Sequence, residues 1–269
     1  MNKDNQSNNK NKRLDQLLVD RGFFSSRTRA NSEILLGNVI VNNEKITKSG
    51  KRFPDDCEIS LKKISIPYVS RGALKLKKAF ESFDINVEKK ICVDLGASTG
   101  GFTEILLING AKKVYSVDVG YGQLHWNLRN DERVCAMEKT NARYLNPSDF
   151  KEKIEFITGD LSFISLTYIL PVVKKLLSPS GTGVFLIKPQ FELEQEKNIK
   201  GIVKNNEFRY EAVMKIVSCC LENLICPEKF DVSPIKGPKG NIEYLLKISI
   251  PFDQKRVVND KMIREKIFI

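Results

Sequence analysis

The chain has 269 residues, of which 41% are hydrophobic and 29% charged, as is typical of a globular protein. No apolar run approaches the ~20 residues of a membrane-spanning helix, and the polar N-terminus lacks the apolar core of a signal peptide. Lysine and arginine outnumber aspartate and glutamate by 44 to 33, a net charge of +11. This charge favours a nucleic-acid partner over a membrane, and a lysine-rich solvated surface explains it about equally well. We expect a cytoplasmic protein.

The six cysteines form no C-x-x-C pair and no cluster with histidine. They are expected to be small core residues in a reducing compartment, and we expect neither zinc nor another metal. Residues 1–12 are rich in asparagine and lysine, and they are predicted to be a disordered tail.

Residues 13–61 have the pattern of a compact basic module. Leu14, Leu17 and Leu18 share one face of a predicted helix that ends at Gly22. Ser25 and Ser26 can cap a second helix, which carries Arg27 and Arg29 and ends near Gly37. Short strands are predicted over 39–41 and 58–61, with the basic segment 45–52 as part of their connection.

This module contains R-L-D-Q-L-L-V-D-R-G, S-R-T-R-A and I-L-L-G-N-V-I-V-N-N, and it resembles the alpha-L RNA-binding motif named after ribosomal protein S-four. The resemblance implies docking on folded RNA, mainly through phosphates. It assigns RNA contacts by position to five basic residues: Arg27, Arg29, Lys45, Lys48 and Lys51.

Residues 62–67 are predicted to be a linker, and a second domain is predicted over 68–252. An amphipathic helix around Lys75 opens this domain, and strands then alternate with helices. Strands are predicted over 90–94, 113–118, 133–137, 154–159, 183–187, 225–232 and 242–250, and helices over 102–109, 123–129, 166–177 and 207–223. Such alternation predicts a mostly parallel, doubly wound sheet. The turn-rich segment 233–241 predicts an antiparallel hairpin of the last two strands, the mixed ending typical of class I methyltransferases. Residues 253–269 are a charged tail for which a helix is possible.

The run D-L-G-A-S-T-G-G-F, which begins at Asp94, is the centre of this domain. An apolar strand ends on an acid, breaks into small residues and continues as a helix, and small residues let the backbone approach a ligand closely. Asp118 ends the next strand, where a carboxylate can accept two hydrogen bonds from ribose hydroxyls. Together these features indicate an adenosine-bearing cofactor, most plausibly S-adenosylmethionine.

Charged residues that follow distinctive motifs are the candidates for chemistry. Asp160 and Lys188 follow the fourth and fifth strands, where open α/β sheets bind ligands. In methyl transfer to a ribose hydroxyl, a lysine kept partly neutral by burial and a neighbouring ammonium can take the hydroxyl proton or steer the oxygen lone pair. We expect Lys188 in that role, Asp160 and Glu243 as orienting carboxylates, and Lys75 as the second ammonium or a substrate contact. His125, the only histidine, is expected to pack or to line a pocket.

The motifs Y-V-S-R-G-A-L-K-L, D-L-G-A-S-T-G-G-F-T, V-D-V-G-Y-G-Q-L, D-L-S-F-I-S-L, I-K-P-Q-F-E and G-N-I-E-Y-L-L follow the basic module in order. Their order closely resembles the TlyA family, called haemolysin A in older usage, over about residues 13–252. The resemblance implies a class I, FtsJ-like fold with a seven-stranded sheet, and 2′-O-methylation of cytidine riboses in ribosomal RNA of assembled subunits. It implies a catalytic tetrad of Lys75, Asp160, Lys188 and Glu243. It also implies a cofactor site of Asp94, Gly96, Ser98, Thr99, Gly100, Phe102, Asp118 and Asn141, with Asn141 near the adenine.

Two departures from the family pattern are minor: Ala73 stands where a second glycine is common, and Asn141 where an acid is common. Two alternative functions stay open. One is a secreted pore-forming protein, which the older family name suggests but which needs a signal peptide, an amphipathic hairpin or a membrane helix. The other is an RNA-binding assembly factor without activity, against which the intact tetrad argues. The oligomeric state is open, with a monomer favoured.

Overall fold

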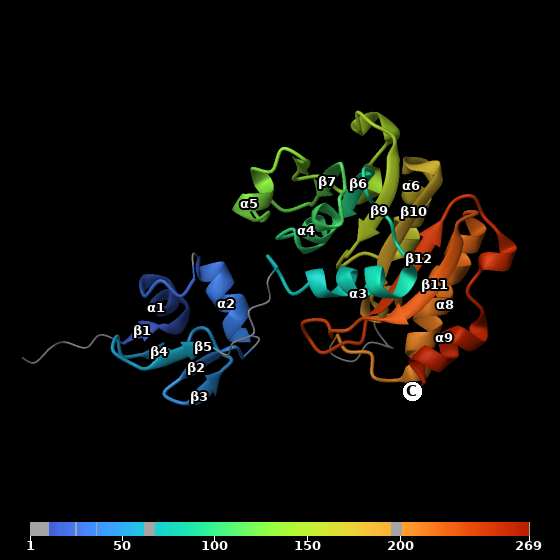
Figure 1. Ribbon diagram of the computed structural model, residues 1–269. Helices are drawn as coiled ribbons and strands as arrows, with labels where there is room; N and C mark the ends of the chain where they lie inside the picture. Colours follow the sequence, from blue (N-terminus) through green and yellow to red (C-terminus); the bar gives the residue numbers. More distant parts are fainter. Residues whose placement is uncertain (1–10, 25, 36, 62–67, 195–200, 269) are drawn as a thin grey trace, which may run out of the picture. The chain divides into compact units, whose positions relative to one another are not determined.

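The computed structural model describes residues 11–24, 26–35, 37–61, 68–194 and 201–268. The chain divides into two compact units, Met1–Ile66 and Pro67–Ile269, which are described separately below (Figure 1). The expected linker, residues 62–67, and residues 1–10 of the expected tail lie outside the described residues. Among the described residues, no helix combines the length and the apolarity needed to cross a bilayer.

The first unit packs two helices on small antiparallel sheets. The helices are α1 (Leu14–Asp20) and α2 (Arg27–Leu35), and the strands are β1 (Lys12–Arg13), β2 (Val39–Val41), β3 (Glu44–Ile46), β4 (Arg52–Phe53) and β5 (Ile59–Leu61). One sheet has the order β3-β2-β5, and β1 pairs with β4. Leu14, Leu17 and Leu18, the face expected from the sequence, are fully buried against Ile34 and Val39.

The basic connection expected over residues 45–52 is partly strand. Asn42 and Asn43 both adopt positive φ, 49° and 65°, which makes the two-residue turn of a hairpin and returns the chain as β3 alongside β2. The first strand, β1, begins at Lys12, one residue before the expected start of the module, because Lys12 pairs with Phe53 of β4.

The second unit is built on a seven-stranded sheet in the order β11-β12-β10-β9-β6-β7-β8. The strands are β6 (Ile91–Leu95), β7 (Lys113–Val117), β8 (Val134–Met137), β9 (Ile154–Gly159), β10 (Leu177–Ile187), β11 (Cys226–Val232) and β12 (Tyr244–Ser249). Strands β8, β7, β6, β9 and β10 run parallel, and β12 runs antiparallel to both β10 and β11. The predicted mostly parallel sheet with an antiparallel ending is confirmed.

Helices cover both faces of this sheet (Figure 1). They are α3 (Ala73–Phe83), α4 (Gly101–Ile108), α5 (Trp126–Arg129), α6 (Leu170–Leu176), α7 (Pro189–Glu192), α8 (Asn206–Glu222) and α9 (Asp260–Ile267), with 3-10 turns η1 (Ala142–Tyr144), η2 (Pro147–Asp149), η3 (Leu166–Tyr168) and η5 (Gln254–Arg256). Strand side chains alternate between the faces. Cys92 and Val114 join the core under α3 and α4, whereas Val93 and Tyr115 join the core under α6 and α8.

Several element boundaries differ from the sequence prediction, among them the start of α5, which lies at Trp126 instead of residue 123. The helix expected over 166–177 is divided into η3 and α6, with Pro171 in the first turn of α6, where a missing N–H costs no hydrogen bond. Strand β10 then begins at Leu177, well before the expected residue 183, and pairs with β9 through an irregular register. The charged C-terminal tail contains α9, because Ile263 and Ile267 lie on one helical face and are buried in the core.

Candidate active site

Four charged side chains meet at the edge of the sheet where the parallel strands end. Lys75 Nζ lies 3.1 Å from Asp160 Oδ2 and 2.7 Å from Glu243 Oε2. Lys188 Nζ lies 2.6 Å from Asp160 Oδ1 and donates a hydrogen bond to Ser162 Oγ at 2.9 Å. Asp160 therefore bridges two lysines, and the structure brings all four residues of the expected tetrad into one chain of ion pairs.

The topology explains why residues so distant in the sequence meet here. Asp160 directly follows β9 and Lys188 directly follows β10, which are parallel neighbours. Glu243 directly precedes β12, and because β12 is antiparallel to β10, its start lies beside the end of β10, with Tyr244 opposite Ile187. Lys75 comes from the first turn of α3.

Glycines let these elements approach one another. A Cβ on Gly101 would lie 2.3 Å from Ser70 Oγ and 2.9 Å from the Ala73 backbone nitrogen, so only glycine lets α4 pack this closely on the start of α3. A Cβ on Gly237 would lie 2.4 Å from Glu243 Oε1. The positions of Lys75 and Glu243 therefore depend on two residues without side chains, neither of which the sequence analysis selected.

Burial and charge act in opposite directions on this cluster. Lys75 and Lys188 are each 6% exposed and Glu243 is 1% exposed. Burial lowers the pKa of Lys75, but the Asp160 and Glu243 carboxylates outweigh it and hold that pKa above its usual value. Burial likewise raises the pKa of Asp160, and the two lysines outweigh it and hold that pKa below its usual value. Lys75 and Asp160 are therefore charged near neutral pH.

The glycine turn after β6 has the open backbone expected of a cofactor loop. Gly96, Ser98 and Gly100 have positive φ of 80°, 50° and 96°. A Cβ on Gly96 would lie 3.0 Å from the Asp160 carbonyl oxygen, so this turn also lies against the tetrad. Ser98 is exposed and Thr99 is half-buried, and the carbonyl of Thr99 accepts a hydrogen bond from the His125 N–H.

Asp94 and Phe102 are buried beneath the turn. Asp94 Oδ2 accepts hydrogen bonds from Thr103 N at 2.9 Å and Thr103 Oγ1 at 2.8 Å, and Asp94 Oδ1 accepts one from Thr158 Oγ1 at 3.2 Å. Asp94 is fully buried, and burial raises its pKa to about 7. Phe102 packs in the apolar core under α3 and α4. Both residues therefore hold α4 and the turn in place. The sequence analysis did not distinguish this supporting role from direct contact with the cofactor.

Asp118 and Asn141 flank the turn on the side of β7 and β8. The Asp118 carboxylate is partly exposed and accepts hydrogen bonds from Ser98 N at 2.8 Å and Gly120 N at 2.7 Å, and each oxygen retains a second lone pair for a hydroxyl group. Asn141 is exposed and lines a cavity of about 410 Å³ with Met137, Thr140 and Leu145. A turn of small residues, a carboxylate and a neighbouring cavity fit an adenosine-bearing cofactor.

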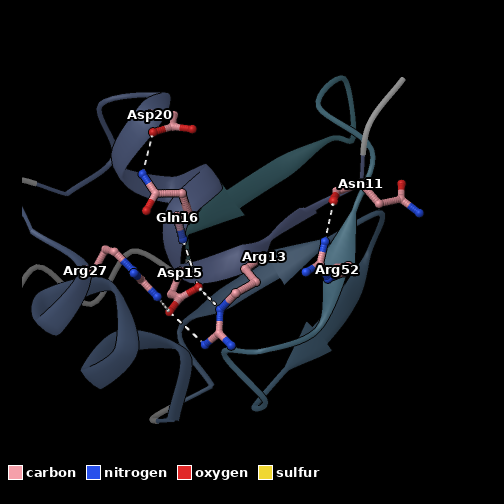
Figure 2. A network of polar contacts seen from close by, with 7 residues as sticks. All are labelled: Asn11, Arg13, Asp15, Gln16, Asp20, Arg27 and Arg52. Atoms are coloured by element: carbon pink, nitrogen blue, oxygen red, sulfur yellow. Dashed lines mark hydrogen bonds and ion pairs between the residues drawn. The ribbon is translucent and has the colours of Figure 1, made fainter. Parts of the chain in front are cut away.

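In the first unit, Figure 2 shows how Arg27 is held. Asp15, whose side chain is 1% exposed, accepts hydrogen bonds from Arg13 Nε at 3.0 Å and from Arg27 Nη2 at 2.8 Å (Figure 2). The hydrogen bond from Arg13 outweighs burial and, together with that from Arg27, lowers the pKa of Asp15 to about 2. Arg27 therefore has a structural partner, while about half of its side chain stays exposed.

The other basic residues expected to bind RNA are exposed. Arg29 lies on α2, Lys45 on β3, and Lys48 and Lys51 in the segment before β4. Arg13, Arg27 and Arg52 line a cavity of about 620 Å³ in the same unit. Of these three, only Arg27 was expected from the sequence. Arg13 and Arg52 lie together because β1 pairs with β4, a non-local contact that the sequence pattern does not reveal.

Histidine and cysteine are residue types often used in metal or nucleophilic chemistry. Within the described part of the chain, no group of three or more histidine, cysteine, aspartate or glutamate side chains is arranged to hold a metal ion. The six cysteines are free thiols, and five of them are buried. His125 caps α5, because its Nδ1 accepts a hydrogen bond from Asn127 N at 3.3 Å.

Comparisons with known proteins identify a family model that matches each of the two units. The model of the FtsJ-like methyltransferase family matches residues 68–249, and the S4 domain model matches residues 12–55. The chain is 45% identical to Hemolysin A of Brachyspira hyodysenteriae, over 87% of this chain and 98% of that protein. It is 40% identical to the 16S/23S rRNA (cytidine-2′-O)-methyltransferase TlyA of Mycobacterium tuberculosis, over 87% of this chain and 88% of that protein.

Solved structures show the same relationships. A chain from Streptococcus thermophilus that carries a hemolysin designation superposes with a TM-score of 0.76 at 40% identity, over 96% of this chain and 94% of that one. An S-adenosylmethionine dependent methyltransferase from Mesorhizobium loti superposes with a TM-score of 0.51 at 14% identity, over 66% of this chain and 98% of that one. At 14% identity, the similarity to the Mesorhizobium loti structure shows a shared fold alone.

Proposed function

The chain belongs to the FtsJ-like methyltransferase family, whose members use S-adenosylmethionine, and from this premise we propose that it methylates the 2′-hydroxyl of cytidine riboses in ribosomal RNA. The assembled tetrad of Lys75, Asp160, Lys188 and Glu243 is the observation that carries the proposal. The relative named above as a cytidine-2′-O-methyltransferase supports the substrate class.

The cofactor residues act by position. The turn from Gly96 to Gly100 would present backbone to the cofactor, Asp118 would accept hydrogen bonds from its ribose hydroxyls, and Asn141 would lie near the adenine. Ser98 and Thr99 complete the loop, while Asp94 and Phe102 hold it from below. When bound, S-adenosylmethionine supplies an electrophilic methyl group on a sulfonium that departs as a neutral thioether.

The tetrad prepares the ribose hydroxyl for this transfer. The 2′-oxygen forms a bond to the methyl carbon while the carbon–sulfur bond breaks, and the hydroxyl must lose its proton in the same process. Lys188 lies at the end of the ion-pair chain. As a neutral amine it accepts the hydroxyl proton; as an ammonium it steers the oxygen lone pair toward the methyl group, and the proton passes to solvent water. Asp160 fixes Lys188, and Glu243 fixes Lys75, so the charges are held in place before the substrate arrives.

We propose that residues 13–61 bind RNA and that residues 68–252 carry the catalytic site. Arg27, Arg29, Lys45, Lys48 and Lys51 would contact phosphates, so they would contribute affinity more than sequence selection. The net charge of +11 supports a polyanionic partner. We further propose that the protein acts as a monomer in the cytoplasm, where assembled ribosomal subunits are found.

A transfer assay tests the proposal. Purified protein is incubated with methyl-labelled S-adenosylmethionine and with ribosomal subunits from cells that lack this gene, and the labelled nucleotides are mapped by mass spectrometry. We expect label at the 2′-oxygen of cytidines. Lys188→Ala should keep cofactor binding, measured by calorimetry, and lose transfer; retained transfer in this variant would remove Lys188 from the mechanism.

Two controls separate the alternatives. Cofactor binding by the wild-type protein without transfer to any ribosomal RNA would favour an assembly factor without activity. Leakage of liposomes on addition of the pure protein would favour a pore-forming function, which the name of one relative suggests.

A further inference from the structure

Two motifs at the active site contain polar residues that the tetrad does not use. Ser162 and Ser165 belong to D-L-S-F-I-S-L, and Glu192 ends I-K-P-Q-F-E. Ser162 Oγ lies 2.9 Å from Lys188 Nζ, and it shares that ammonium group with Asp160 Oδ1. Lys188 Nζ therefore has two partners within the protein, Ser162 through a hydrogen bond and Asp160 through an ion pair.

Glu192 connects the loop after β9 to the turn after β10. Its carboxylate is 3% exposed, accepts a hydrogen bond from Ser165 Oγ, and accepts a second from the Leu166 N–H at 3.0 Å. Burial raises the pKa of Glu192, against the effect of the hydrogen bond from Ser165. Lys215 Nζ donates to the main-chain oxygen of Glu192 at 2.6 Å, which fixes the backbone of this residue to α8.

The loop between Asp160 and Leu166 needs such a restraint. Phe163 has a φ of 64°, a left-handed conformation that costs a residue with a side chain about 1 kcal/mol. At its first end, the loop is held by the hydrogen bond from Asp160 N to Leu95 O at 3.1 Å. At its other end it is held by Glu192, and Ser162 lies between these two attachments.

We propose that Ser162 is a positioning residue for methyl transfer and that Glu192 keeps it in position; this inference rests on the proposed function. Lysine has four rotatable side-chain bonds, and fixing them costs up to about 2 kcal/mol of conformational entropy. Asp160 and Ser162 together select one orientation of the Lys188 ammonium, and its remaining direction faces the 2′-oxygen of the substrate. The Glu192 brace maintains the distance between Ser162 and Lys188.

The experiment compares kcat, KM for ribosomal subunits, and cofactor affinity across a set of single variants. Ser162→Ala and Glu192→Ala should each lower kcat by on the order of 10-fold to 100-fold, because a small displacement of a reacting group is costly. KM and the dissociation constant for S-adenosylmethionine should change little. Ser162→Thr keeps the hydroxyl and should retain most of the activity. Glu192→Gln should do the same, because its amide can still accept from Leu166 N and donate to Ser165 Oγ.

The double variant Ser162→Ala/Glu192→Ala tests whether the two residues act through one another. If they do, the kcat of the double variant should be close to that of the less active single variant. A loss of kcat equal to the product of the two single losses would overturn the role of Glu192. Ser249→Ala is the matched control. Ser249 also donates from a buried hydroxyl to a buried glutamate, Glu228, but lies at the opposite end of β12 from the active site, so its kcat should stay unchanged.

The possible failures are distinguishable. A wild-type protein that methylates no ribosomal RNA would overturn the proposed function itself. A wild-type protein that transfers methyl groups, together with a Ser162→Ala variant of undiminished kcat, would overturn this inference alone. If Glu192→Ala does not fold, Ser162→Ala and Ser162→Thr still decide the role of Ser162, and an inactive but folded Glu192→Gln would contradict the brace.

Discussion

The Glu243 carboxylate lies 2.7 Å from the Lys75 ammonium, and both side chains are almost fully buried. A buried charge without a partner is much more costly than a buried pair. This ion pair therefore links the stability of the second unit to the integrity of its active site.

Glu243→Ala is predicted to lower the free energy of unfolding by about 3 kcal/mol or more. Lys75 and Lys188 would then share the single carboxylate of Asp160, which leaves one buried positive charge uncompensated. Urea unfolding monitored by circular dichroism measures this change. Glu81→Ala breaks the exposed Lys77–Glu81 pair on the same helix as Lys75 and should change stability by less than about 0.5 kcal/mol. Equal effects of the two substitutions would contradict the structural role of Glu243.

Asp94→Asn should change how stability depends on pH. The pKa of Asp94 is about 7 in the folded protein against an ordinary value of 3.8, so the folded state holds this proton more tightly. The resulting stability is complete at low pH and is lost as pH rises from about 4 to about 7, by roughly 1.4 kcal/mol for each unit of pKa difference. The asparagine side chain of the variant cannot ionise, and so the wild-type protein should lose stability relative to the variant across this range.

Urea titrations of both proteins at a series of pH values between about 4 and 8 measure this difference. The asparagine keeps an oxygen to accept from the Thr103 N–H, so the variant is expected to fold. Stabilities of the two proteins that run parallel across the whole range would show that Asp94 does not retain a proton on folding.

Gly96→Ala should abolish cofactor binding. Its φ of 80° disfavours any side chain, and the new Cβ would lie 3.0 Å from the Asp160 carbonyl oxygen, so the turn and the tetrad must move apart. Gly122→Ala is the matched control, because Gly122 has a φ of 69° but open space around its Cβ position. Calorimetry with S-adenosylmethionine should show lost affinity in the first variant and retained affinity in the second. The reverse result would show that crowding at Gly96 is unimportant.

Lys48→Ala and Arg29→Ala should weaken binding to ribosomal subunits without changing affinity for S-adenosylmethionine. Each phosphate contact that is lost should reduce the slope of log affinity against log salt concentration by about 1. Filter binding over a range of salt concentrations measures the slope. Lys261→Ala removes the same charge from the exposed surface of α9 and should leave the slope unchanged, whereas an equal effect would indicate a response to net charge alone.

The sequence by itself determined the fold class and the members of the tetrad. Apolar runs that end on Asp94 and Asp118, separated by helical patterns, specify parallel strands, because each run must be buried on both faces of a sheet. The carboxyl ends of such strands lie at one edge, so Asp160 and Lys188 could be placed together without coordinates. Lys75 and Glu243 do not follow parallel strands, so this rule could not place them. They were assigned from the resemblance of the ordered motifs to the family.

Only the tertiary structure decided which cofactor-loop residues face outward and which support the loop. Asp94 and Phe102 are each four residues from exposed Ser98 in the sequence. The direction of their side chains depends on the pleat of β6 and on how α4 packs in the core. Gly101, Gly237 and Glu192 were likewise inaccessible to local pattern, because their roles consist of contacts with distant segments. Local sequence specifies the elements, whereas close packing between them specifies the site.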